Sequence, residues 1–358
     1  GGTQGQALGG GAPPAAPGAP SAPSSFSAPS QEQMNGRALS PQEERTKDAL
    51  MALRSEIGKA VVGQEGAVTG LIIALVAGGH ALLEGVPGVA KTLLVRTMAT
   101  ALDVDMARIQ FTPDLMPADI TGSLVWDAGS SAFEFRRGPV FTNLLLADEI
   151  NRTPPKTQSA LLEAMEERQV SVDGQTHALA DPFMVIATQN PVEYEGTYPL
   201  PEAQLDRFLL KLELPLPGRD AEFGIVKRHR DGFNPLALAD AGVRPVASPA
   251  DIAAARGAAA RVDVSDTVLA YLVDVCRATR ESPSVRLGAS PRGATALLRT
   301  TRVWAFLQGR GFATPDDVKA MAAPTLAHRI GLRAEADLEG LTAARVVEGV
   351  LAQVPVPR

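Results

Sequence analysis

A glycine-rich run near residue 90 carries the strongest chemical signal in the chain. The run reads Gly85-Val86-Pro87-Gly88-Val89-Ala90-Lys91-Thr92. It follows an apolar run that ends at Leu83 and opens a predicted helix, which is the context that a phosphate-binding P-loop requires. Backbone N–H groups of such a loop and of a helix N-terminus form a concave anion site. We therefore expect residues 85–92 to bind ATP, with Lys91 on the β and γ phosphates and the Thr92 hydroxyl on Mg²⁺.

One residue of this run departs from the usual pattern, because Ala90 stands where a P-loop normally has glycine. Glycine is the residue that accepts a positive φ without steric cost. A methyl group is nevertheless the smallest possible intrusion into the loop. We therefore predict that the loop stays intact, provided that Ala90 keeps a negative φ.

Two adjacent carboxylates, Asp148 and Glu149, follow a second apolar run at residues 144–147. This arrangement looks like a Walker B element. Asp148 would then hold Mg²⁺ through water, together with Thr92, and Glu149 would orient and polarise the attacking water. The alternative is that the pair only caps the following helix. Like-charge repulsion between neighbouring carboxylates at a strand tip argues against that alternative.

A polar amide follows a third apolar run, at residues 183–187, where the sequence reads Thr188-Gln189-Asn190-Pro191. If the run is a strand of the same sheet, Asn190 lies beside the two motifs above and can hydrogen-bond the γ-phosphate or the attacking water. An Asn-Pro pair by itself is more often only a turn. Its position after a buried strand favours the functional interpretation.

The elements that must position these residues are predicted from five short apolar runs. These occupy residues 81–83, 109–111, 144–147, 183–187 and 208–210. Apolar runs without alternation are typical of strands buried on both faces of a parallel sheet, with helices between them. Two further segments alternate around a glycine turn, at residues 123–135 and 169–179, and predict β-hairpins inserted into this pattern.

The strand signal ends after residue 218, and the rest of the chain predicts helices. They are expected at residues 219–230, 249–260, 265–279, 291–309, 315–329 and 338–352. The first thirty residues are dominated by Gly, Ala, Pro and Ser and carry no charge, which is typical of a disordered tail. We therefore predict a tail at 1–38, an α/β nucleotide-binding domain at 39–216 and an all-α lid domain at 217–358.

Composition excludes several classes of function. The formal net charge of -6 and the sequence pI of about 5.4 give no basic field for nucleic acid. A single cysteine and four scattered histidines offer neither a disulfide nor a zinc-ligand spacing. No apolar stretch reaches the roughly 18 residues that a membrane span needs. We expect a cytoplasmic protein without a membrane span.

Taken together, the motifs resemble those of the AAA+ ATPases, and more narrowly those of the MoxR family. The resemblance covers about residues 39–350. It is carried by the P-loop run, by Asp148-Glu149-Ile150-Asn151-Arg152, by residues 187–191, by residues 195–203 (Glu-Gly-Thr-Tyr-Pro-Leu-Pro-Glu-Ala) and by Gly288-Ala289-Ser290-Pro291-Arg292. It implies a P-loop AAA+ three-layer sandwich with a five-stranded parallel sheet, β-hairpin insertions and a helical lid. The family belongs to the branch that also holds magnesium-chelatase motor subunits.

The resemblance also implies roles for further residues. Val62-Gly63-Gln64 matches the segment that packs on adenine, and Asn190 matches sensor 1. Arg207, expected at the start of the last strand, matches the arginine finger that reaches a neighbouring subunit's γ-phosphate, and Arg292 matches sensor 2. A finger supplied by a neighbour requires a homo-oligomer, and the family expectation is a hexameric ring.

The two hairpins match the family's insertion in helix 2 and its pre-sensor hairpin. In ring motors such insertions point toward the pore or a partner. The first hairpin carries Trp126, Phe133 and Phe135. Two interpretations of these aromatic residues stay open, contact with a client protein and simple packing across the strands.

The function predicted from the sequence is Mg²⁺-dependent ATP hydrolysis that drives chaperone-like remodelling or activation of a partner protein. The partner is expected to be a protein, with a von Willebrand factor A (VWA) domain protein as one candidate. One alternative is a DNA-associated AAA+ motor or transcription activator, which the acidic charge opposes. Another is a nucleotide-dependent assembly module that does not hydrolyse ATP, which Glu149 opposes.

Overall fold

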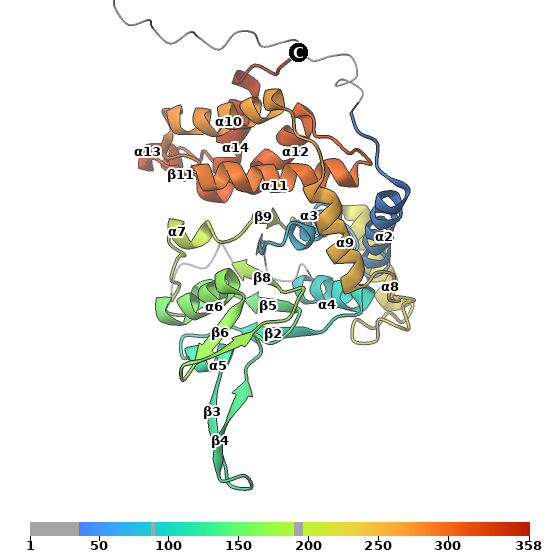
Figure 1. Cartoon of the computed structure of the whole chain (residues 1–358), viewed down its shortest axis with the longest axis vertical. Coiled ribbons are helices and arrows are strands. Elements are labelled where there is room, and N and C mark those ends of the chain that lie inside the picture. Colours follow the sequence, from blue (N-terminus) through green and yellow to red (C-terminus); the bar gives the residue numbers. More distant parts are fainter. Residues whose placement is uncertain (1–35, 87–89, 190–195) are drawn as a thin grey trace, which may run out of the picture. The chain divides into compact units, whose positions relative to one another are not determined.

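Five strands form a parallel sheet in the order β2-β5-β8-β1-β9 (Figure 1). Their bounds are β1 Ala81–Glu84, β2 Met106–Gln110, β5 Leu144–Asp148, β8 Met184–Gln189 and β9 Leu210–Glu213. Each contains or adjoins one of the five predicted apolar runs, and all pairings are parallel. The computed structural model of the chain describes residues 36–86, 90–189 and 196–358.

Side chains of the central strands are buried on both faces of this sheet. Leu144 and Leu146 point into one apolar cluster, which includes side chains of α2 (Pro41–Gly58), α3 (Glu65–Val76) and α4 (Lys91–Leu102). Leu145 and Ala147 point into the other cluster, which includes side chains of α6 (Pro155–Glu167). Because successive strand residues face opposite sides, an uninterrupted apolar run serves both clusters. The three-layer α/β sandwich predicted from the sequence is confirmed.

Two antiparallel hairpins extend this framework, as predicted. One pairs β3 (Gly122–Asp127) with β4 (Ala132–Arg137), and the other pairs β6 (Gln169–Val172) with β7 (Gln175–Ala178). The turn between β6 and β7 is made by Asp173 and Gly174, both with positive φ, as an Asp-Gly hairpin turn requires. The β3–β4 hairpin projects away from the sheet (Figure 1). Short elements lie between these strands: α5 Pro117–Thr121, the 3₁₀ turn η1 Ile150–Arg152 and α7 Glu202–Leu205.

The C-terminal region is mainly helical, and most of its helices begin close to the predicted positions. Its helices are α8 Arg219–Arg230, α9 Pro249–Ala260, α10 Asp266–Glu281, α11 Pro291–Leu307, α12 Pro315–Leu326, α13 Ala334–Leu338 and α14 Ala343–Gln353. The helix predicted at 338–352 is confirmed over residues 343–352, but its predicted start is wrong, because the chain turns at Gly340 with φ +83 before α14 begins. A two-stranded antiparallel sheet of β10 (Val285–Leu287) and β11 (Gly331–Leu332) was also not predicted. A 3₁₀ turn, η2 (Ala327–Arg329), precedes β11.

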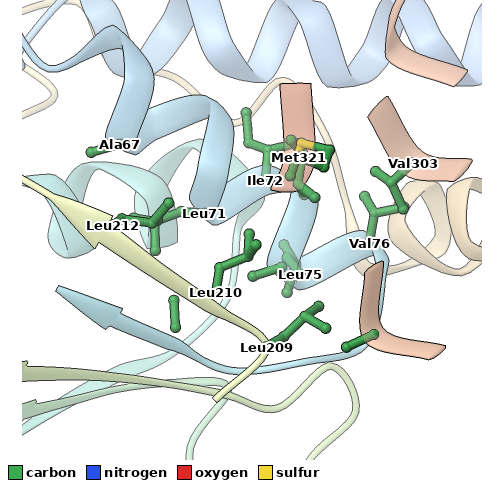
Figure 2. Close-up of a cluster of buried hydrophobic side chains, with 14 of the residues drawn as sticks. Ala67, Leu71, Ile72, Leu75, Val76, Leu209, Leu210, Leu212, Val303 and Met321 are labelled. Carbon is green, nitrogen blue, oxygen red and sulfur yellow. The ribbon is translucent and has the colours of Figure 1, made fainter. Parts of the chain in front are cut away.

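Helix α3 joins the helical region to the edge strand of the sheet. Figure 2 shows Leu71 and Leu75 of α3 beside Leu210 and Leu212 of β9, while Val303 of α11 and Met321 of α12 approach the other side of α3. All these side chains belong to one continuous buried cluster. The helical region and strand β9 therefore share a core. Of the described residues, no helix combines the length and the apolar character that crossing a membrane demands.

Candidate functional site

The predicted site residues fall at two opposite edges of the parallel sheet. Lys91 follows the carboxyl end of β1, and Asp148 is the last residue of β5. These ends lie at one edge, which we call the carboxyl edge. Arg207 precedes Leu210, the first residue of β9, so it lies beyond the other edge, the amino edge. Pro87, Gly88, Val89 and Asn190 lie outside the described residues.

At the carboxyl edge, Lys91 is partly buried and its Nζ donates to the carbonyl oxygen of Gly85 at 3.0 Å. Burial lowers the pKa of Lys91, whereas the negative charges of Asp148, Glu149 and Glu84 oppose that shift. The lysine is therefore close enough to the acidic pair to feel its field. Thr92 is the second residue of α4, next to the N–H groups that a helix start leaves unpaired.

Ala90 corrects the expectation made for this loop. Its φ is +55 and its ψ is 36, so it occupies the left-handed region, and the negative φ on which our expectation was conditional is not met. The residue stands immediately before α4, at the position where a glycine would adopt this conformation freely. Ala90 itself therefore has the conformation that glycine adopts most easily, and its methyl group bears a steric cost there.

The acidic pair is held by a residue that the sequence did not single out. Thr188, fully buried at the end of β8, donates its hydroxyl to Asp148 Oδ1 at 2.6 Å. The same hydroxyl oxygen accepts from the backbone N–H of Glu149 at 2.9 Å. Glu149 itself has φ +57, a conformation that costs a non-glycine residue free energy. Thr188 thus fixes both members of the pair.

Two arginines balance the charge of this pair within the chain. Arg108, on the neighbouring strand β2, contacts Asp148 Oδ2 at 2.7 Å. Arg152 of η1 contacts Glu149 at 3.1 Å. Both arginine side chains are more than one third exposed, so solvent screens these ion pairs and they can exchange for other partners. Together with the Thr92 hydroxyl, the Asp148 carboxylate is an oxygen donor set of the kind that Mg²⁺ prefers.

The segment predicted to contact adenine lies between α2 and α3. Gly63 has φ +79, and its Cα faces Pro217 and Ala221 so closely that an added Cβ would lie 3.1 Å from the Ala221 side chain. Gln64 is buried and donates to the carbonyl oxygen of Pro215 at 2.9 Å. A cavity of about 310 Å³, lined in part by Val62 and Arg228, adjoins the segment. The structure therefore places Val62-Gly63-Gln64 against the start of the helical region.

The amino edge carries an alternating set of charges. Arg207 pairs with Glu166 of α6 at 3.2 Å. Arg292, which follows Ser290 and Pro291 at the start of α11, contacts Glu166 at 3.5 Å and Asp206 at 3.2 Å. The full length of strand β9 separates this cluster from the carboxyl edge, since Leu210 pairs with Ala81 and Glu213 with Glu84. Arg207 and Arg292 are thus brought together, but not with Lys91 of the same chain.

Comparisons with known proteins decide which family this arrangement represents. The model described as "ATPase family associated with various cellular activities (AAA)" matches residues 80–210, and "AAA lid domain" matches residues 277–350. "Chaperone MoxR1" of Mycobacterium tuberculosis is 38% identical, over 98% of this chain and 93% of its own length. The chain belongs to the MoxR family of AAA+ ATPases.

Other relatives agree with membership of the MoxR family. Protein YeaC of Bacillus subtilis is 47% identical over 84% of this chain and 92% of its own length. "Protein MoxR" of Methylorubrum extorquens is 33% identical over 87% of this chain and 96% of its own length. A crystal structure of a protein from Cytophaga hutchinsonii, assigned as an ATPase, superposes with a TM-score of 0.81 at 40% identity, covering 88% and 97% of the two chains.

Some residues of this MoxR-family site were missed by sequence reasoning. Thr188 had a local signal, because it stands in the strand-end run that drew attention to Asn190. Asp206 stands in the run Leu205-Asp206-Arg207-Phe208, which contributes to the AAA+ resemblance through Arg207, whereas Glu166 had no signal beyond its charge. Their role as counterions depends on α6, the segment before β9 and α11 meeting in space. Such contacts join residues that are far apart in the sequence, as in the 126-residue separation between Glu166 and Arg292.

Proposed function

We propose that this MoxR-family chain hydrolyses ATP with Mg²⁺ in an oligomeric ring and uses the energy to remodel or activate a partner protein. The observation that supports this most directly is the separation of the site into two halves. Lys91, Asp148 and Glu149 gather at the carboxyl edge. Arg207 and Arg292 gather at the amino edge, so a complete site requires a second copy of the chain.

The carboxyl edge is the half of the site that binds ATP and activates the attacking water. Backbone N–H groups of the non-proline residues in the run 85–92 hold the phosphates, and the Lys91 ammonium neutralises charge on them. Thr92 and Asp148 hold Mg²⁺, whose contribution when bound is to withdraw charge from the phosphate oxygens. Glu149 orients the attacking water and accepts its proton. Asn190 is proposed as a further ligand for this water, and Val62-Gly63-Gln64 as the wall on which adenine packs.

The amino edge contributes its arginines to the nucleotide site of a neighbouring subunit. A guanidinium is always charged and planar, so Arg207 can clamp phosphoryl oxygens of the next subunit as charge redistributes. Arg292 lies in the same cluster and is proposed to act across the same interface. Because donor and acceptor lie on different faces, the contact is heterologous and closes into a ring, for which we propose six subunits. We further propose a nucleotide-binding domain at 39–216 and a lid domain at 217–358.

A protein client is supported by a relative and by the β3–β4 hairpin. The relative in Mycobacterium tuberculosis is named a chaperone. On the hairpin, Trp126 and Phe133 are 55% and 66% exposed and pack edge to face with their centroids 5.2 Å apart. Phe135 instead stacks on His177 of the second hairpin. We propose Trp126 and Phe133 as the client-facing pair, and a VWA-domain protein as the first client to test.

Steady-state ATP turnover tests the proposal. Lys91→Ala, Glu149→Gln and Arg207→Ala should each lower turnover by at least about 10³-fold, the smallest effect expected from loss of an arginine finger. An equal mixture of Glu149→Gln and Arg207→Ala subunits should recover up to about one quarter of the wild-type rate per subunit. Half of the mixed subunits have an intact nucleotide site, and half of these have a neighbour that supplies Arg207.

Three results would count against the proposal. Undiminished turnover in all three variants would show that these residues are not the catalytic set. Absence of recovery in the mixture would show that Arg207 does not act on a neighbour. Strong stimulation of turnover by DNA would favour a DNA-associated motor, and tight ATP binding without phosphate release would favour a non-hydrolysing assembly module.

A further inference from the structure

A buried arginine of the lid holds the chain segment that carries Arg207. Arg329 lies in η2, and its side chain is only 5% exposed. Its guanidinium donates to Asp206 Oδ1 at 2.7 Å and to the carbonyl oxygens of Asp206, Phe208 and Leu209 at 3.1, 2.9 and 3.1 Å. These partners flank Arg207 on both sides. The segment 206–209 is therefore fixed by one side chain that comes from 120 or more residues further along the chain.

A second lid residue completes this contact. His328 Nε2 lies 2.7 Å from the carbonyl oxygen of Phe208, and since a carbonyl can only accept, the histidine donates. Phe208 is fully buried, and it precedes the first hydrogen-bonded residues of β9. A buried carbonyl without a hydrogen-bond donor costs free energy. The lid supplies the donors for the Phe208 carbonyl that the sheet does not provide. Neighbouring residues His328 and Arg329 thus form one clamp on residues 206–209.

Two shared carboxylates connect the clamp to Arg292 and Arg207. The carboxylate of Asp206 is shared by Arg329 on Oδ1 and Arg292 on Oδ2. The carboxylate of Glu166 is shared by Arg292 and Arg207. Arg329 is buried at one end of this series, whereas Glu166, next to Arg207 at the other end, is 44% exposed. The series is fixed at Arg329, and the ion pairs of Glu166 with Arg207 and with Arg292, whose side chain is 57% exposed, are the ones that solvent can weaken.

From this geometry we infer that Arg329 is a positioning residue, which sets Arg207 for donation to the neighbouring subunit and couples the lid to that donation. The inference rests on the proposed function, because it assumes that Arg207 acts across a subunit interface. Arg329 lies within the residues that match the AAA lid domain. Movement of the lid in one subunit therefore displaces the finger that this subunit presents to the next one.

The test is the same subunit-mixing assay, applied to Arg329→Lys. Lysine keeps the charge but lacks the planar fork that contacts three carbonyls and a carboxylate together. Turnover of Arg329→Lys rings should fall about 10- to 100-fold, as expected from displacement of a catalytic group by about 1 Å. Mixing with Glu149→Gln subunits should restore turnover, because those subunits keep both the clamp and Arg207. ATP affinity should remain within about twofold of wild type.

Arg299→Lys is the matched control. Arg299 is another lid arginine that donates to a backbone carbonyl of the α/β part, that of Ala77, and it is not among the residues that hydrogen-bond to residues 206–209. This variant should show neither the loss of turnover nor recovery on mixing. If Arg329→Lys does not fold, as judged by thermal unfolding and ring assembly, Asp206→Asn takes its place, since it removes the carboxylate half of the clamp.

The outcomes separate the two proposals. Suppose that Arg207→Ala is rescued in the mixture. If Arg329→Lys rings are then as active as wild-type rings, or if they lose turnover and mixing does not restore it, the positioning role of Arg329 is overturned while donation of Arg207 to a neighbour stands. The same conclusion follows from Asp206→Asn where it replaces Arg329→Lys. If Arg207→Ala is not rescued either, donation across the interface fails, and the role of Arg329 fails with it.

Discussion

The carboxyl edge and the amino edge of the sheet are built in different ways. At the carboxyl edge, Lys91 is the first residue of helix α4 and Asp148 is the last residue of strand β5, so each is placed by the element to which it belongs. At the amino edge, Arg207 depends on an ion-pair series in which contacting residues lie as far as 126 residues apart in the sequence. The first half is fixed by its own motifs and by a neighbouring strand of the same sheet, which supplies Thr188. The second half is fixed by tertiary contacts with the lid, and it can therefore respond to lid movement.

The largest expected effect separates ATP binding, which depends on Lys91 at the carboxyl edge, from the catalytic contribution of Arg207 at the amino edge. Lys91→Ala should weaken ATP binding about 10- to 100-fold, the loss expected for a hydrogen-bonded charge. Arg207→Ala should leave ATP affinity of the isolated subunit within about twofold and lower ring turnover by about 10³-fold or more. Titration with a fluorescent ATP analogue, followed by steady-state turnover, checks both. Weak ATP binding by Arg207→Ala subunits would contradict the division into two halves.

A smaller effect is expected at Thr188, which orients the acidic pair. Thr188→Val keeps the shape of the side chain but removes the donor to Asp148 and the acceptor for the Glu149 N–H. An unpaired buried N–H costs about 1–3 kcal/mol, so Glu149 should lose its left-handed conformation part of the time. Turnover should fall about 10- to 100-fold, with ATP affinity changed much less.

Thr301→Val is the control for this substitution. Thr301 is also fully buried, but its hydroxyl has no hydrogen-bond partner among the residues that the structure describes. Replacing it with valine should leave turnover unchanged. Equal losses from Thr188→Val and Thr301→Val would show that general packing, rather than the hydroxyl, explains the effect.

Acid should act on two buried histidines, His80 and His328, which both lie near the amino edge of the sheet. His80 accepts from the Val185 N–H at Nδ1 and donates from Nε2 to Met165, and His328 donates to Phe208. Burial lowers the pKa of each to about 3. Between pH 6.5 and 3 these histidines are protonated in the unfolded chain but stay neutral in the folded chain. The free energy of unfolding therefore falls as the pH falls. At pH 5 the loss should be about 2 kcal/mol per histidine.

Denaturant unfolding at pH 7 and pH 5 measures this loss. His328→Gln, which keeps a donor for Phe208, should make the difference between the two pH values smaller by about 2 kcal/mol. His229→Gln, at an exposed position, is the control and should keep the wild-type difference. An unchanged difference in His328→Gln would mean that His328 does not resist protonation in the folded chain.

Local patterns explain why most of the framework was predictable. The five strands follow from apolar runs, and helix starts follow from caps such as Ser40, which exchanges hydrogen bonds with Glu43 as a capping box. The β10–β11 pair was not predictable, because strands of three and two residues have no periodic pattern. Contacts such as Arg329 with Asp206 depend on the folded arrangement of segments 123 residues apart. The roles assigned to the site residues stay predictions.

The smallest expected effect concerns Ala90, whose positive φ the sequence could not reveal. Ala90→Gly removes a methyl group from a left-handed residue and should stabilise the chain by about 0.5–1 kcal/mol. Ala99→Gly, within the same helix α4, is the matched control and should have the opposite sign, costing about 0.5–1 kcal/mol. Denaturant unfolding of the two variants compares them directly. If both substitutions destabilise the chain, Ala90 is not strained, and the left-handed conformation before Lys91 does not exist in solution.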